Sequence, residues 1–217
     1  MQYLALIGDV VGSKDVPKRA DLQKKLTQAL KKINDRKPRP VVSPYTVTLG
    51  DEFQAVYKTA DTLFLDVFSI LVEVYPEKIR FGVGLGELTT PINSKQALGM
   101  DGPAFHRARA AIAVLKESED LIRLQGEPPP QQKPEFDQWR LFAYLLNFVS
   151  QKVGNWERNR LRIICGLLAN RSVAELEQEL KVSKVAVYKN INTAALDEFV
   201  GLCNEITRYL NAELKKS

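Results

Sequence analysis

Two aspartates stand at the ends of apolar segments in the first quarter of the chain. Asp9 closely follows the apolar run at residues 4–7, and Asp51 lies in the sequence Leu-Gly-Asp-Glu-Phe at residues 49–53. A carboxylate buried at a strand end loses hydration, so it needs a charged or hydrogen-bonding partner. A divalent metal ion that carries a nucleotide phosphate is a partner of suitable chemistry, because hard cations bind carboxylate, phosphate and water oxygens. The pair therefore suggests a metal and phosphate site.

Composition narrows the remaining classes of function. The chain has 217 residues, is 45% hydrophobic and has a formal net charge of +5. This moderate basicity favours a nucleotide or nucleic-acid partner without establishing one. Cys165 and Cys203 lie in apolar helical contexts, and His106 is the single histidine. We therefore expect packing cysteines, and neither a zinc site nor a histidine-based nucleophile triad.

The chain carries no signal of membrane insertion or export. No apolar run approaches the roughly 20 residues that span a bilayer. The first apolar segment starts almost at Met1, without a basic leader or a small-residue cleavage site. We expect a cytoplasmic protein.

The elements that must position the aspartates alternate between strand and helix patterns. Expected strands are residues 3–10, 45–49, 53–57, 79–86 and 121–124, and expected helices begin at Pro17, Asp61 and Pro103. This order predicts an α+β domain with a mainly antiparallel sheet covered by helices on one face. The first strand then lies between the hairpin and the strand at 79–86, which brings Asp9 and Asp51 together. Alternating glycines from Gly82 onward suit close approach by another backbone or a ligand.

A proline-rich segment divides the chain. Residues 126–134 read Gly-Glu-Pro-Pro-Pro-Gln-Gln-Lys-Pro, and three consecutive prolines cannot continue a helix or a central strand. We predict a first domain at residues 1–126, a linker at 127–134 and a helical domain at 135–217.

The predicted helical domain contains a helix-turn-helix pattern within about residues 155–195. Ser172 and Ser183 are placed to cap its two helices. The exposed face of the second helix offers side chains that can reach phosphates and base edges of double-stranded DNA, namely Lys184, Tyr188, Lys189 and Asn192. The first helix is acidic, so an interaction-only module is the alternative. Residues 136–152 are apolar almost all round and are expected to be buried or to form an inter-subunit contact.

Several motifs resemble known families. Four motifs of this chain resemble those of class III nucleotidyl cyclases and occur in the same order. They are Asp-Val-Val-Gly-Ser at 9–13, Gly50-Asp51, residues 79–86 and Gly-Pro-Ala-Phe-His-Arg-Ala at 102–108. Residues 49–53 also resemble the signature hairpin of diguanylate cyclases. The whole chain is similar to the SatD family of bacterial proteins. The resemblance implies a ferredoxin-like palm fold for roughly the first 125 residues.

This resemblance also implies a two-metal nucleotide site. Asp9 and Asp51 would be the catalytic, metal-binding carboxylates, helped by the backbone carbonyl of Val10, with Mg²⁺ or Mn²⁺ as the ion. The turn with Gly12, Ser13 and Lys14 would hold the phosphates of a nucleoside triphosphate or related nucleotide. Palm-type cyclases generally build their sites across a dimer, so a homodimer is implied as well.

The chain departs from the cyclase pattern at three positions. Val47 stands where a lysine usually reads adenine, and His106 and Ala110 stand where an asparagine and an arginine usually lie. These departures favour nucleotide binding over catalysis. Our interpretation is therefore a nucleotide- and Mg²⁺-binding protein coupled to a DNA-binding helix-turn-helix, acting as a ligand-responsive regulator. The alternatives are an active nucleotidyl cyclase or nucleotidyltransferase whose helical domain serves dimerisation or regulation, and a non-catalytic interaction protein. Taken singly, each aspartate is also compatible with an ordinary cap or turn.

Overall fold

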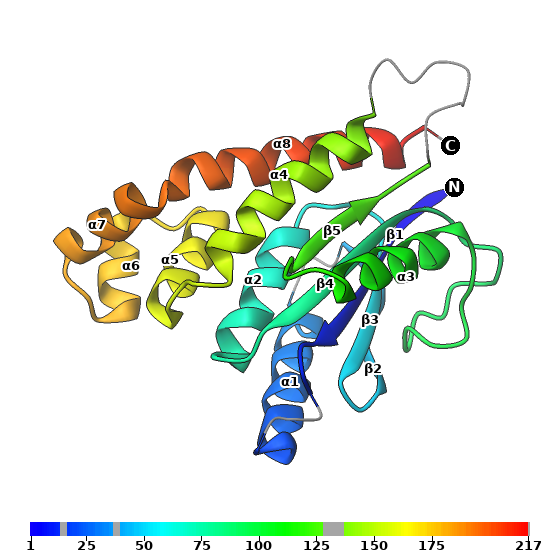
Figure 1. The fold of residues 1–217 in the computed structure, drawn as a ribbon, viewed down its shortest axis with the longest axis horizontal. Helices are drawn as coiled ribbons and strands as arrows, with labels where there is room; N and C mark the ends of the chain where they lie inside the picture. Colours follow the sequence, from blue (N-terminus) through cyan, green and yellow to red (C-terminus); the bar gives the residue numbers. More distant parts are fainter. Residues whose placement is uncertain (14–16, 37–39, 128–136, 217) are drawn as a thin grey trace.

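The computed structural model describes residues 1–13, 17–36, 40–127 and 137–216 (Figure 1). Its strands are β1 Gln2–Val10, β2 Val41–Leu49, β3 Glu52–Tyr57, β4 Ile79–Glu87 and β5 Ile122–Gln125. Its helices are α1 Arg19–Asn34, α2 Leu63–Val74, α3 Pro103–Lys116, α4 Gln138–Val153, α5 Arg158–Leu168, α6 Val173–Leu180, α7 Lys184–Ala194 and α8 Leu196–Leu214. The expected elements are present with shifted boundaries. Helix α1 begins at Arg19 rather than at Pro17, α2 begins at Leu63 rather than at Asp61, and β2 begins at Val41 rather than at residue 45.

The five strands form one sheet in the order β2-β3-β1-β4-β5. All neighbouring strands are antiparallel except β4 and β5, which are parallel. The α+β class and the central place of β1 between the hairpin and β4 are thus confirmed. The register pairs Asp9 with Glu52 on β3 and with Arg80 on β4, so Asp9 has a charged neighbour on each side.

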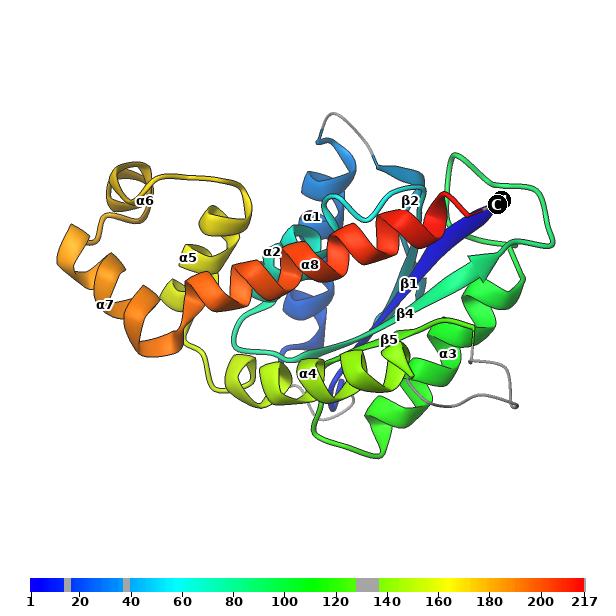
Figure 2. The same ribbon diagram turned by 90° about the horizontal axis from the view of Figure 1, so that it is seen from above.

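Helices cover both faces of this sheet, which corrects the expectation of one covered face. Leu4 and Leu6 belong to the hydrophobic cluster with α1 and α2, whereas Ala5 and Ile7 belong to a second cluster with α3. Figure 2 shows α3 on the other side of the strands from α1 and α2. Because successive strand residues point to opposite faces, an apolar run such as β1 can serve both clusters.

The glycines of β4 explain how α3 packs so close to the sheet. A Cβ at Gly84 would overlap the carbonyl oxygen of Ala104, and one at Gly82 would lie 2.5 Å from that of Ala108. The glycines therefore leave space for the backbone of α3, and the small alanine side chains on the facing side of α3 allow the close approach. The expected close approach at these glycines is confirmed, and the approaching backbone is α3.

The C-terminal helices pack on the sheet layer. On α4, Ser150 accepts a hydrogen bond from the backbone N–H of Ile122 on β5, at 3.2 Å. Phe68 of α2 contacts Trp156 and Phe199, with ring centroids 6.4 and 5.4 Å away. One hydrophobic cluster therefore extends across both predicted domains. The boundary remains a prediction, since most of the predicted linker lies outside the described residues.

Two further expectations concern cysteines and membranes. Burial raises the pKa of the Cys165 thiol to about 12 and raises that of Cys203 as well, and both thiols are free. This agrees with a packing role, because a thiol with such a raised pKa stays protonated at neutral pH. Within the described part of the chain, no helix combines the length and apolar character needed to cross a membrane.

Candidate functional site

The carboxylate of Asp9 is met by two cations of the chain itself. Asp9 is 9% exposed at the end of β1, and its side chain points toward the α3 face. One of its oxygens lies 3.4 Å from the Arg80 guanidinium on β4, and the other lies 3.2 Å from the Lys116 amine at the end of α3. Arg80 is also fixed by a hydrogen bond of 3.0 Å to the carbonyl oxygen of Leu115. The charged partner that Asp9 requires is thus already provided.

Asp51 lies at the same end of the sheet, at the tip of the β2–β3 hairpin. Gly50 there has φ of +58°, a left-handed conformation that favours glycine in a tight turn. The Asp51 carbonyl oxygen accepts a hydrogen bond from the N–H of Val10 at 3.3 Å, and the Asp51 carboxylate accepts one from the Ser13 hydroxyl. The structure therefore places Asp51 against the end of β1, one residue beyond the Asp9–Glu52 pair of the register.

The donor set at this end fits a hard cation in a limited way. Asp9 and Asp51 supply carboxylate oxygens of the kind that Mg²⁺ binds. Glu52 is opposite Asp9 in the strand register and so shares its face, but its carboxylate accepts a hydrogen bond from Thr48. Among the described residues, no three histidine, cysteine, aspartate or glutamate side chains are grouped to hold a metal ion. A cation here would need phosphate or water oxygens to complete its coordination.

The predicted phosphate turn is described only in part. Gly12 has φ of +61°, which suits a glycine, and Ser13 is buried with its hydroxyl on Asp51. Lys14 lies outside the described residues. Helix α1 begins at Arg19. Gly12 and Ser13, the described residues of this turn, are therefore not adjacent in sequence to the first turn of the helix.

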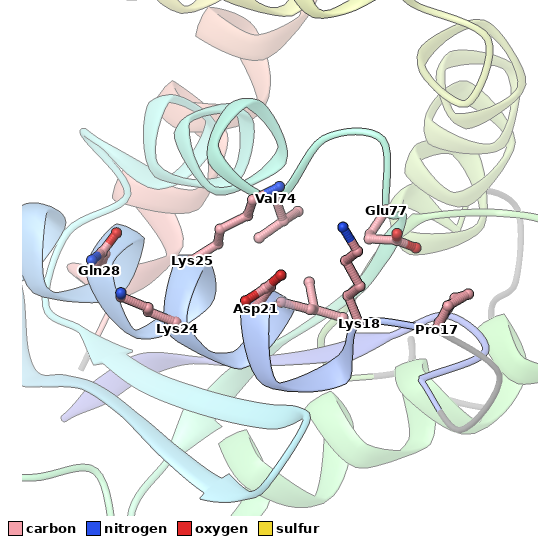
Figure 3. A pocket seen from close by; sticks show the side chains of 9 residues that line it. Pro17, Lys18, Asp21, Lys24, Lys25, Gln28, Val74 and Glu77 are labelled. Atoms are coloured by element: carbon pink, nitrogen blue, oxygen red, sulfur yellow. The ribbon is translucent and has the colours of Figure 1, made fainter.

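A cavity of about 550 Å³ lies on the α1 side of the sheet, near this turn (Figure 3). Lys18, which precedes α1, and Asp21 and Lys25 of α1 extend toward the end of α2, and Glu77 lies across from Lys18. Asp9, by contrast, points to the α3 face. This cavity and the Asp9 carboxylate are thus on opposite sides of the sheet.

The positions that depart from the cyclase pattern have other roles. His106 is exposed on α3, where its ring lies 3.1 Å from the Asp101 carboxylate, and Ala110 is exposed one turn later. Arg107 donates a hydrogen bond of 2.6 Å to the carbonyl oxygen of Leu85. Val47 is half-buried opposite Phe53 in the hairpin. Neither Arg107 nor any of the three departing positions is placed beside Asp9 or Asp51 by a contact among the described residues.

Sequence reasoning missed a second buried carboxylate, Asp66 on α2. It is 1% exposed and accepts hydrogen bonds from Arg36 at 2.9 Å and from Tyr57 and Thr62, both at 2.8 Å. Burial raises its pKa, while these donors act in the opposite direction. The Tyr57 hydroxyl is also hydrogen-bonded to that of Tyr45. The sequence signal was slight, because Asp66 stands alone within an apolar helix.

The helix-turn-helix expectation corresponds to α6 and α7. Ser172 caps α6 in a reciprocal capping box with Glu175, and the Ser183 side chain accepts a hydrogen bond from the N–H of Ala186 at the start of α7. Lys181, in the turn, has φ of +55° where glycine is more usual. Both predicted caps are confirmed. Arg160 of α5 donates a hydrogen bond of 3.1 Å to Asn190, which ties α5 to α7.

The four candidate DNA-binding residues are all exposed on α7. Their spacing of four, one and three residues places them on one side of the helix. Sequence reasoning missed Val185, which is 77% exposed in the middle of this side. The signal was available, since Val185 falls outside the buried positions Val187 and Ile191. The α7 face is defined here as Lys184, Val185, Tyr188, Lys189 and Asn192.

The fold is that of an α+β protein with two aspartates at one end of its sheet and an all-helical C-terminal region. The chain belongs to the SatD family, whose profile matches residues 3–201. Among solved structures, it is similar to a bacterial light-regulated adenylyl cyclase with a TM-score of 0.42 and 14% identity, over 57% of this chain and 74% of that one. A second structure of a bacterial light-regulated adenylyl cyclase gives 0.43 and 14%, over 57% of this chain and 43% of that one. The curated proteins gave no match.

Proposed function

We propose that this protein binds double-stranded DNA through the α7 face, and that the sheet end with Asp9 and Asp51 binds a nucleotide with Mg²⁺ that changes DNA binding. The observation that carries the DNA proposal is the exposure of every residue of this face on one capped helix. Lysine and asparagine suit phosphates and base edges, and Val185 suits a thymine methyl group.

The acidic helix α6 should repel DNA less strongly than its composition alone indicates. Glu175 and Glu179 lie 3.2 and 3.6 Å from the Arg171 guanidinium. Glu177 lies 3.9 Å from the Lys184 amine, a long and exposed pair that a phosphate can replace. Much of the negative charge of α6 is therefore matched locally.

The DNA proposal is tested by fluorescence anisotropy on a mixed-sequence duplex over a series of salt concentrations. The double variant Lys184→Ala, Lys189→Ala should weaken binding and reduce the salt slope by about 2, because each lysine to phosphate contact releases about one counterion. Lys58→Ala removes an exposed lysine elsewhere and should leave the slope unchanged. Equal slopes for the wild type and the double variant would argue for an interaction-only module.

The nucleotide proposal is supported by the placing of both aspartates at one sheet end, with the Ser13 hydroxyl on the Asp51 carboxylate. A bound Mg²⁺ would contribute charge neutralisation to the nucleotide phosphates. The partly exposed Lys116 can move away from Asp9 when a cation binds, whereas Arg80 is held by the backbone. Asp9 and Asp51 would bind the cation, and Ser13 would orient Asp51.

Calorimetric titration with each nucleoside triphosphate, with and without Mg²⁺, tests this second part. We expect Mg²⁺-dependent binding that Asp51→Asn weakens at least tenfold and that Glu119→Gln, an exposed control, leaves unchanged. The DNA titration repeated with nucleotide and Mg²⁺ tests the regulatory link. Chromatography after incubation addresses the enzymatic alternative: a product that forms with the wild type but not with Asp51→Asn would favour a nucleotidyl cyclase or nucleotidyltransferase over a sensor.

A further inference from the structure

We infer that two copies of this chain pair through the outer face of α4, with the two α4 helices antiparallel. The inference does not depend on DNA or nucleotide binding. It starts from an unusual concentration of exposed apolar side chains. Among the described residues, eight large hydrophobic side chains are exposed, and three of them, Leu141, Tyr144 and Phe148, lie on α4.

These three residues form a stripe rather than a scatter. Their spacing of three and then four residues places them on one side of the helix, opposite the buried residues Trp139, Leu146 and Ser150. This alternation of three and four is the spacing of the contact residues in paired helices. Tyr144 is 62% exposed and Phe148 is 65% exposed. We call Leu141, Tyr144, Leu145 and Phe148 the α4 stripe; its fourth member, Leu145, is half-buried.

The partner is identified by the symmetry of the charges around the stripe. Asp137 precedes Leu141 by one helical turn, and Lys152 follows Phe148 by the same interval. An antiparallel pair with its two-fold axis between Tyr144 and Leu145 therefore places Asp137 of each copy opposite Lys152 of the other. It also places Leu141 opposite Phe148. A two-fold interface must be complementary to itself, and this arrangement of residues is.

The surroundings of the stripe provide room for such a contact. A groove of about 630 Å³ adjoins Phe148 between α4 and α8, with Trp156 and Leu202 in its lining. Figure 2 looks onto this layer, where α4 and α8 run side by side along the outside of the molecule. Leu141 of the second copy would lie at the edge of this groove. The two exposed aromatic residues leave about 200 to 300 Å² in water, so the groove must contribute to reach the roughly 800 Å² per partner of a stable interface.

The stoichiometry test is sedimentation of the full chain over a range of concentrations. The wild type should have twice the protomer mass of 24.5 kDa. The variant Tyr144→Glu, Phe148→Glu should sediment as a monomer that still unfolds cooperatively on heating, because both side chains are exposed and only the stabilisation by association is lost. Val114→Glu, a similarly exposed apolar position on α3, should remain dimeric. A monomeric wild type, or a dimeric double variant, would overturn the inference.

The antiparallel register is tested by oxidation of cysteine variants. A mixture of Leu141→Cys and Phe148→Cys chains should form disulfide-linked heterodimers, whereas each variant alone should not crosslink. The native thiols give little background because Cys203 is buried and Cys165 is half-buried. Crosslinks between two Phe148→Cys chains would indicate parallel helices and overturn the register.

A charge test gives an independent check. Lys152→Glu should weaken dimerisation about tenfold, because it brings two acidic residues together. Adding Asp137→Asn should recover part of this loss, and asparagine retains the ability to cap α4. If the second change recovers nothing, Asp137 is not opposite Lys152 and the register is wrong.

Discussion

The Asp9 end of the sheet and the α7 face both carry charged residues, but these charges are paired within the fold at Asp9 and exposed to solvent on α7. Asp9 is buried and lies within 3.4 Å of two cations from distant parts of the sequence. On α7, the Lys184 amine lies 3.9 Å from the Glu177 carboxylate in an exposed pair, and the residues of the α7 face are exposed. Charges that the fold already matches stabilise it, whereas exposed charges remain available to a partner. A charged residue that is paired within the fold is therefore less available to a binding partner than one that is exposed to solvent.

The largest expected effect on stability concerns the packing of α3 on the sheet face that carries Asp9. Gly84→Ala should destabilise the protein by at least about 3 kcal/mol, because the added methyl group overlaps the helix backbone, which cannot move aside as a side chain can. Gly201→Ala, where the added group meets no atom within 4 Å, should be neutral or stabilising. Urea unfolding measures both. Similar stabilities would mean that α3 is loosely held and the face accessible.

The next effect concerns the ion group around Asp9. Asp9→Ala should lower the free energy of unfolding by about 1 to 2 kcal/mol, because it leaves the mostly buried Arg80 guanidinium without its carboxylate. Asp51→Ala, at a more exposed turn, should lower it by less than about 1 kcal/mol. Chemical unfolding without divalent ions isolates this effect. Equal losses would show that the two aspartates do not differ in structural role.

A smaller effect should appear at the start of α6 in acid. The backbone N–H and hydroxyl of Ser172 hold the Glu175 pKa below its usual value of 4.5. The folded state then binds this proton less readily, so the stabilisation is present above that value and is lost as the pH falls through the lowered pKa. The protection of the Ser172 amide against exchange, relative to its intrinsic rate, should fall as the pH drops through this lowered pKa. Glu175→Gln keeps the capping geometry without titrating and should abolish this pH dependence.

The smallest expected change in stability is on the α7 face. Each single replacement of Lys184, Tyr188, Lys189 or Asn192 by alanine should change the free energy of unfolding by less than about 0.5 kcal/mol, since exposed residues contribute little. Thermal unfolding of these variants, and of the Lys184→Ala, Lys189→Ala double variant used in the DNA titration, measures this. A large loss of stability would mean that these residues support the fold and would remove the contrast with Asp9.

Much of the fold follows from local patterns that the sequence displays. The strand and helix order, the hairpin at Gly50 and the caps at Ser172 and Ser183 depend on residues within a few positions of each other. Such short-range preferences act wherever the segment lies in the protein. The placing of α3 could not be predicted in this way. It depends on contacts between the β4 glycines and the α3 alanines. The alternating glycines indicate close approach by a backbone or a ligand, but not which segment of the chain approaches.

The sequence by itself determined that Asp9 and Asp51 lie at the same end of the sheet, because this follows from the strand order. It also determined that α7 presents a polar face, because this follows from the helix periodicity. Only the tertiary structure decided what surrounds them. Arg80 is 71 residues from Asp9 along the chain, and only the packing of β4 and α3 on β1 brings Arg80 and Lys116 to it. The exposure of Leu141, Tyr144 and Phe148 was decided in the same way, since burial depends on which faces the rest of the chain covers.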